Sequence, residues 1–122
     1  MVVIRNWRDQ TPTVSHESAI IWDLFRGPGY EDKTDDEAPM KAIRGFTRHA
    51  LQGRKNSDYH DHDNAEQVYY ITKGRGQMKI DGDLYAVVEG DAVYIPPKAK
   101  HQLINGSDDW IEHLIITAEI SG

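Results

Sequence analysis

Two stretches decide the fold of this chain: HDHDNAEQVYYITKG at residues 60–74 and GDAVYIPPKAKHQLIN at residues 90–105. The first begins with two histidines, His60 and His62, that are separated by one residue. Side chains alternate between the two faces of a strand, so both imidazoles project from the same face if this stretch is extended. The pair could therefore chelate one metal ion.

The spacing between these residues continues in a regular way. Four residues lead from His62 to Gln67, and six more lead to Gly74. The second stretch places four further residues at fixed offsets: Gly90, Pro96, His101 and Asn105. Together they resemble the two motifs of the cupin superfamily. Lys98 stands where the second motif has a further glycine, and Gly53 lies one residue further upstream than the first motif asks.

The resemblance implies an all-β fold, a double-stranded β-helix or jelly-roll β-barrel. It implies a single cupin domain over residues 1–122, with the first motif at about residues 53–74 and the second at residues 90–105. It also implies one divalent transition metal ion inside the barrel, which is Mn, Fe, Co, Ni, Cu or Zn. The implied ligands are His60, His62, Gln67 and His101.

The third ligand position has two candidates. Glu66 keeps the residue type of the family motif, but seven residues separate it from Gly74 instead of six. Gln67 satisfies both the spacing back to His62 and the spacing on to Gly74. Only one of two adjacent strand residues can face inward, so the register favours Gln67, although a bulge would reverse this.

A neutral ligand set has a chemical consequence. Three imidazoles and an amide are all neutral, so a divalent metal keeps its full charge and is a stronger Lewis acid. The same ligands stabilise a trivalent ion less well than a ligand set that includes a carboxylate. We therefore expect a metal-dependent enzyme of the non-redox lyase or isomerase type, with a small oxygenated substrate such as an organic acid or sugar acid. The alternatives are a mononuclear-metal dioxygenase and a noncatalytic binding or regulatory cupin.

Composition excludes several other classes of protein. The 122 residues include no cysteine, so neither disulfides nor thiolate ligands are available. A formal net charge of -6 disfavours nucleic acids and anionic membrane surfaces as partners. No apolar run approaches the roughly 20 residues that cross a bilayer, and the first residues lack the layout of a signal peptide, so we expect a cytoplasmic protein.

Gly, Pro, Asn and Asp punctuate the chain at short intervals, which is typical of an all-β domain. We predict nine strands: residues 19–25, 41–51, 58–62, 67–72, 76–80, 84–88, 92–95, 101–104 and 111–118. Asp81 and Gly82 tolerate the positive φ angles of a tight turn and predict a hairpin over residues 77–88. No window shows helical periodicity with matching caps.

Two side chains are candidate catalytic groups. Tyr69 shares the face of Gln67 and could donate a hydrogen bond or move a proton, although a buried tyrosine is more often part of the core. His113 shares a face with two isoleucines and could enter the pocket as an acid or base, although a plain core histidine is the more common case. His16 and His49 have no spacing partner and receive no role.

The strand at residues 41–51 leaves a further alternative open. Arg44 and Arg48 alternate with Thr47 and His49, so either set could line the barrel. An inward arginine would argue for an anionic substrate, whereas an outward one is the more common case.

Two segments bear on partners. The loop at residues 27–39 carries five carboxylates and is either solvated surface or a lid over the pocket. The apolar run at residues 19–22 fits a homodimer interface or ordinary core. We expect a small-molecule substrate and a homodimer.

Overall fold

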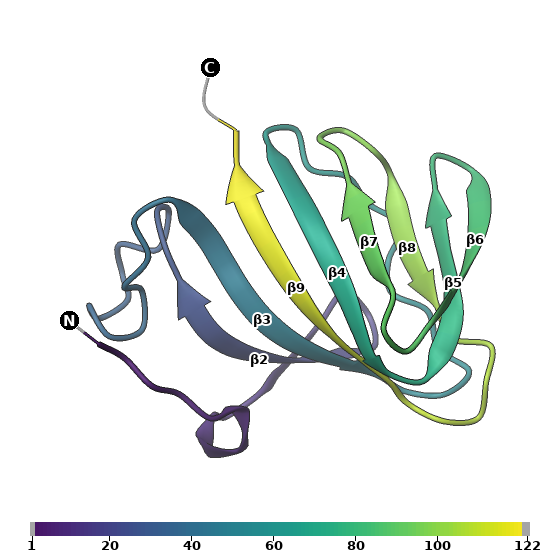
Figure 1. Cartoon of the computed structure of the whole chain (residues 1–122), viewed down its shortest axis with the longest axis horizontal. Helices are drawn as coiled ribbons and strands as arrows, with labels where there is room; N and C mark the ends of the chain where they lie inside the picture. Colours follow the sequence, from purple (N-terminus) through teal and green to yellow (C-terminus); the bar gives the residue numbers. More distant parts are fainter. Residues whose placement is uncertain (1, 121–122) are drawn as a thin grey trace.

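The computed structural model describes residues 2–120, and almost all of its regular structure is β (Figure 1). A 3-10 helix, η1 (Trp7–Asp9), lies near the N-terminus. The strands are β1 (Thr13–Ser15), β2 (Ala19–Arg26), β3 (Ile43–Leu51), β4 (Ala65–Lys73), β5 (Arg75–Ile80), β6 (Asp83–Val88), β7 (Ala92–Ile95), β8 (His101–Ile104) and β9 (Ile111–Glu119). Between residues 2 and 120, no helix is long and apolar enough to span a bilayer.

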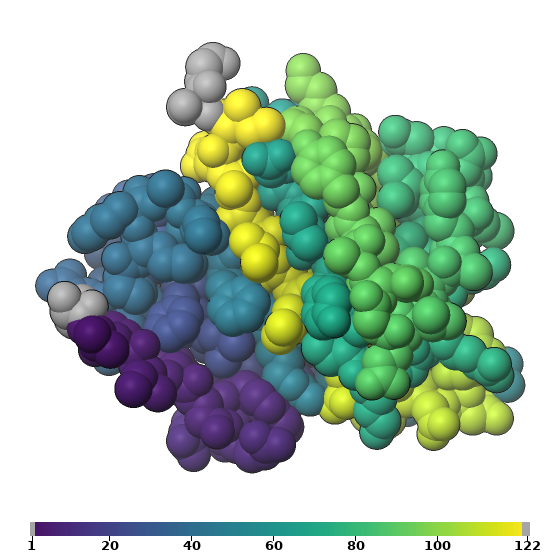
Figure 2. All heavy atoms as spheres, in the orientation of Figure 1, coloured from purple at the N-terminus to yellow at the C-terminus, as the bar shows by residue number. Residues whose placement is uncertain are grey.

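The strands form two antiparallel sheets. One has six strands in the order β1-β2-β3-β9-β4-β7, and the other has three in the order β6-β5-β8. The last strand, β9, lies between β3 and β4, and its atoms form a yellow band between theirs in Figure 2. Strands far apart in the sequence are thus neighbours, as in a jelly roll. The predicted all-β jelly-roll fold is confirmed.

The core draws on both sheets and excludes water almost completely. Ile71 and Ile111 come from the larger sheet, and Met78 and Leu103 come from the smaller one. Full burial of one such side chain stabilises the fold by about 1.5–3 kcal/mol. Burial alternates along β4, where Ala65, Gln67, Tyr69 and Ile71 are buried. This alternation fixes which β4 side chains face the interior.

The predicted hairpin is present as β5 and β6. Its two loop residues have positive φ angles, 47° at Asp81 and 90° at Gly82. Ile80 pairs with Asp83 directly across this loop. A turn with both central residues at positive φ matches the twist of the flanking strands, which is why an Asp-Gly sequence suits this position.

The predicted strand at residues 58–62 is wrong. The segment follows the free edge of β8 but pairs with it only at isolated points, namely Asn56 with Ile104 and His60 with His101. His60 and His101 exchange two backbone hydrogen bonds of 3.1 and 2.8 Å. The segment is therefore irregular because no continuous ladder forms, although it still covers the second edge of β8. Two short elements, η1 and β1, were not predicted, since neither has an alternating apolar pattern.

Candidate metal centre

A cavity of about 180 Å³ lies against β2, β3, β4, β9 and the irregular segment before β4. Five histidines line it: His16, His49, His60, His62 and His113. The barrel thus brings together imidazoles from distant parts of the chain.

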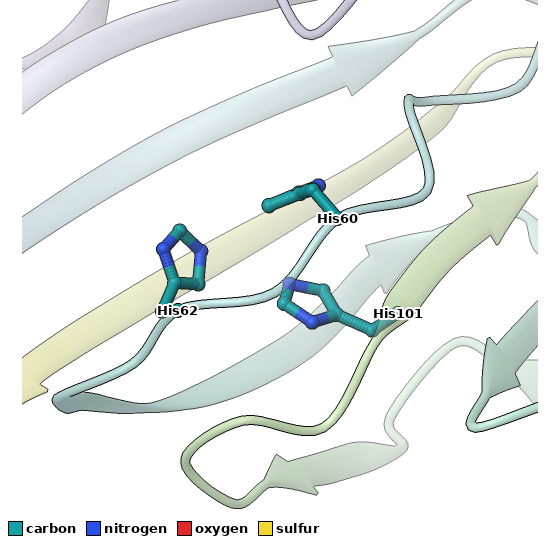
Figure 3. Close-up of side chains that lie close together, drawn as sticks. All are labelled: His60, His62 and His101. Carbon is teal, nitrogen blue, oxygen red and sulfur yellow. The ribbon is translucent and has the colours of Figure 1, made fainter.

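Three histidines converge on one point (Figure 3). One nitrogen from each of His60, His62 and His101 lies within 4.8 Å of the others. The ring centroids of His60 and His101 are 4.4 Å apart, and those of His62 and His101 are 5.4 Å apart. The backbone pairing of His60 with His101 holds the first and third of these side chains side by side. The histidines implied by the motif resemblance therefore share one site.

Backbone carbonyls orient two of these imidazoles. Nδ1 of His60 lies 3.1 Å from the carbonyl oxygen of Asp58, and Nδ1 of His101 lies 2.9 Å from that of Ala99. A carbonyl only accepts, so Nδ1 carries the proton and the lone pair is on Nε2. A hydrogen bond of this kind orients a histidine that ligates a metal.

Gln67 presents its carbonyl oxygen to the same interior. Its Nε2 donates to the Thr117 hydroxyl at 3.0 Å, and the side chain is buried. Glu66 has the opposite orientation, and its carboxylate accepts a hydrogen bond of 2.9 Å from the Tyr94 hydroxyl. Gln67 also lines the cavity, whereas Glu66 does not.

The donor set fits a divalent transition metal. Nε2 of His62, Nε2 of His101 and Oε1 of Gln67 are buried, and each has no hydrogen-bond partner within residues 2–120. Buried polar atoms are normally paired, so three unpaired ones in the interior of one small barrel need an explanation. Imidazole nitrogens and an amide oxygen suit ions from manganese to zinc.

Burial favours the neutral form of two of these imidazoles, His62 and His101. Burial lowers the pKa of His101 to about 4, against the effect of its hydrogen bond to Ala99. Burial also lowers the pKa of His62, and the charges of His60, His16 and Arg44 lower it further. Neutral imidazoles have their lone pairs available, so an ion can bind near neutral pH without displacing protons.

A stack of aromatic rings forms another part of the cavity wall. Tyr69 lies parallel to His113 with centroids 5.5 Å apart, and His113 stacks on His49 at 5.1 Å. Burial raises the pKa of the Tyr69 phenol, and burial lowers the pKa of His113 to about 3. At neutral pH the phenol is therefore a hydrogen-bond donor and the imidazole of His113 is uncharged. Nδ1 of His113 is buried and has no partner among the described residues.

Two cavity histidines had no predicted role. His49 faces the cavity, and its Nε2 lies 2.9 Å from the Thr47 hydroxyl. Thr47 and His49 lie two residues apart on one strand, and this shared face could have predicted that His49 lines the cavity. His16 lies in the turn between β1 and β2, contacts Asp58 at 2.8 Å and stacks on His60 at 4.8 Å. No sequence spacing marks His16, because the fold alone brings it to His60.

The two arginines of β3 face opposite ways. Arg48 lies on the outer face, with its guanidinium 3.6 Å from the ring centroid of Trp7 and an ion pair of 2.6 Å to Glu112. Arg44 lines the cavity together with Arg26 of β2. Strict alternation would place Arg44 and Arg48 on the same face of β3. A register shift between Ile43 and Gly45 breaks the alternation, so the two side chains lie on opposite faces.

The acidic loop at residues 27–39 connects β2 with β3. Its carboxylates are mostly exposed, and the Thr34 hydroxyl lies 2.6 Å from a carboxylate oxygen of Asp36 and from one of Glu37. Tyr30 alone from this loop lines the cavity, among the described residues. The loop is thus a solvated surface that contributes one aromatic side chain to the cavity.

Comparisons with known proteins agree with this fold. A model of the Cupin domain family matches residues 48–117, more than half of the chain. An uncharacterized protein of Methanocaldococcus jannaschii is 46% identical over 46 residues, which is 38% of this chain and only 37% of that protein's length.

Two solved structures are similar over nearly the whole chain. A predicted oxalate decarboxylase from Thermotoga maritima superposes with a TM-score of 0.79 and 21% identity over 98% of this chain and 100% of its own. The polyketide cyclase RemF from Streptomyces resistomycificus superposes with a TM-score of 0.77 and 16% identity over 99% of this chain and 81% of its own. The chain belongs to the cupin family.

Proposed function

We propose that this chain is a metal-dependent enzyme that acts on a small oxygenated substrate, an organic acid or a sugar acid. His60, His62, Gln67 and His101 would hold one divalent transition metal ion. The observation that carries this proposal is the set of buried, unpaired nitrogen and oxygen atoms on His62, Gln67 and His101. Each buried unpaired polar atom costs about 1–3 kcal/mol, and an ion bound by all three atoms would remove that cost.

The ligand set favours chemistry without a change of oxidation state. A bound divalent ion supplies Lewis acidity for a carbonyl, carboxylate or hydroxyl oxygen of the substrate. Gln67 is uncharged, so the ligands leave the charge of the ion undiminished. We therefore favour a lyase or isomerase over a dioxygenase. The names of the two structural neighbours, a predicted decarboxylase and a cyclase, are compatible with this class.

We assign the side chains beside the ligands to substrate handling. The phenol of Tyr69, kept protonated by burial, donates a hydrogen bond to a substrate oxygen. His113 lines the same cavity, and its unpaired Nδ1 would be the position that receives or returns a proton. An anionic substrate would raise the basicity of this imidazole. The apolar side chains of Leu51, Leu103 and Ile115 exclude water from the remaining wall.

Elemental analysis of untagged protein tests the metal centre. The proteins are wild type, His60→Ala, Gln67→Ala and the control Glu66→Ala, whose side chain faces outward, all dialysed without chelator. We expect one near-stoichiometric transition metal in wild type and the control, loss in His60→Ala and weaker binding in Gln67→Ala. Absence of metal in wild type, with no uptake when metals are added back, would overturn the proposal.

A turnover screen of small acids on the metal-loaded protein then separates the alternatives. Conversion that consumes no oxygen supports a lyase or isomerase, and His60→Ala should abolish it. Conversion that consumes oxygen identifies a dioxygenase. Binding of an acid that survives metal removal, without conversion, identifies a noncatalytic module. The homodimer expected from the sequence stays a prediction, which sedimentation would test.

A further inference from the structure

The cavity has a charge opposite to that of the whole chain. The protein has a formal net charge of -6, yet no aspartate or glutamate is among the described residues that line this cavity. Arg26 and Arg44 do line it. A cavity that excludes carboxylates and includes two guanidinium groups, in an acidic protein, favours an anionic occupant.

Two neighbouring bulges aim these arginines inward. The register of β2 shifts between Asp23 and Phe25, and the register of β3 shifts between Ile43 and Gly45. Each shift reverses the alternation that holds along the rest of its strand, and bulges commonly re-aim side chains in this way next to active sites. Past the bulges, the backbone amide of Gly27 donates to the carbonyl of Arg44 at 2.8 Å.

A glycine leaves room for one of the guanidinium groups. Arg26 pairs with Gly45 across the two strands. A Cβ atom at Gly45 would lie 2.6 Å from Nη1 of Arg26, so the side chain of Arg26 passes directly over this glycine. Any larger residue at this position would displace the guanidinium.

Both arginines retain hydrogen-bond donors without a partner. The guanidinium of Arg44 forms no hydrogen bond or ion pair with any residue between 2 and 120, and its contact there is with the ring of Tyr30. Arg26 is paired with Asp23 through Nη2, but its Nε is buried and unpaired. The ring of Tyr30 lies 4.6 Å from the guanidinium carbon of Arg26 and 6.0 Å from that of Arg44. Contact with one aromatic ring holds the two groups close to each other.

We propose that Arg26 and Arg44 form a subsite that binds a carboxylate group of the substrate, with Tyr30 as its aromatic support. Guanidinium groups bind carboxylates through paired hydrogen bonds, and the unpaired donors of these two side chains are available for such bonds. A cavity of about 150 Å³ holds one benzene molecule, so this cavity fits a small organic acid. The inference rests on the proposed function, since it names the substrate class of the same cavity.

Calorimetric titration with defined probes tests the subsite. The probes are malonate and succinate, each compared with its neutral diamide, and inorganic phosphate. The proteins are wild type, Arg44→Met, Arg26→Met and Arg75→Met, which removes the same charge from an exposed position on β5. Each protein is measured with its retained metal and again after chelator treatment, and its metal content is determined.

We expect at least one dicarboxylate to bind wild type about 10-fold or more tightly than its diamide, and more weakly as salt rises. Arg44→Met and Arg26→Met should each weaken this binding by about 10-fold with metal content unchanged, while Arg75→Met stays within about 2-fold of wild type. Gly45→Ala should also weaken it, which covers the case that Arg26→Met fails to fold.

Two results would overturn the subsite: equal binding of dicarboxylate and diamide, or unchanged binding in both cavity variants. Phosphate binding more tightly than both carboxylates would overturn the assignment to a carboxylate. A failed metal centre gives a different pattern, because the arginine-dependent preference for the acid would persist in protein that holds no metal.

Discussion

Gln67 and Thr117 lie directly opposite each other on β4 and β9, and the amide Nε2 of Gln67 donates to the Thr117 hydroxyl at 3.0 Å. This bond uses the donor side of the amide and leaves Oε1 buried and unpaired. The threonine therefore selects the orientation in which the carbonyl oxygen is available as a ligand.

Removal of this hydroxyl should weaken the metal centre. In Thr117→Val the amide of Gln67 loses its partner, so we expect the metal affinity to fall by about 10-fold. The free energy of unfolding of the metal-free protein should fall by about 1 kcal/mol. Competition with a chromophoric chelator measures the affinity. Thr72→Val, on an exposed position of β4, is the control, and an unchanged affinity in Thr117→Val would show that the amide needs no such support.

Chelation should destabilise the protein. An ion that binds only the folded state stabilises it by about 2.7 kcal/mol when its free concentration is 100 times the dissociation constant. We expect the melting temperature of wild type to fall by several degrees on treatment with a chelator and to recover when metal returns. His62→Ala should melt at the same temperature with or without chelator, while Glu66→Ala should behave like wild type.

Acid should destabilise the metal-free protein through His113. Its pKa is about 3 in the folded state because of burial, and about 6.5 in the unfolded chain. Above pH 6.5 both states are neutral. As pH falls below 6.5 only the unfolded state binds the proton, so stability is lost progressively, by up to about 1.4 kcal/mol per pH unit.

His113→Phe keeps a ring between Tyr69 and His49 but cannot titrate. His49, His62 and His101 also have lowered pKa values and act in the same direction. We therefore compare how steeply the free energy of unfolding changes with pH in wild type and in the variant. Urea unfolding between about pH 7 and pH 5 gives this slope for each protein. We expect the wild-type slope to be steeper, which corresponds to the uptake of up to one more proton on unfolding than in the variant. Parallel curves would mean that His113 is protonated in the folded state.

Loss of the Arg48 guanidinium should release the N-terminal arm, which we define as residues 2–12 with the helix η1, without affecting metal binding. The guanidinium of Arg48 contacts both Trp7 and Trp22, at 3.6 and 4.6 Å from their ring centroids, and pairs with Glu112. We expect Arg48→Met to cost about 2 kcal/mol, since cation-π contact and a partly buried ion pair are both lost. Urea unfolding gives the cost, and proteolysis should cut before β1 more readily. Unchanged cleavage would show that the arm is held by other contacts.

The candidate ligands were expected from the motif resemblance, and three of the four lie close together in the sequence. His60, His62 and Gln67 lie within eight consecutive residues, and the alternation of β4 places Gln67 inside and Glu66 outside. The predicted hairpin at Asp81 and Gly82 is likewise local, since two backbone angles determine it. The fold class followed from the same short-range patterns.

The remainder of the cavity depended on register and on long-range pairing. Strict alternation cannot predict a bulge, so it gave Arg44 and Arg48 a common face and offered no reason to place Arg26 beside Arg44. The irregular path of residues 58–62 arises from isolated pairing with β8, which is distant in the sequence. His16 reaches His60 only because β1 and β2 turn back at that point.

The sequence by itself thus determined the all-β fold and the residues with metal-binding chemistry, because periodicity and turn chemistry act over a few residues. Only the tertiary structure decided which arginines line the cavity and which buried nitrogen and oxygen atoms lack a partner. Those properties depend on two register shifts and on hydrogen bonds between distant residues, such as Gln67 and Thr117, which are 50 positions apart.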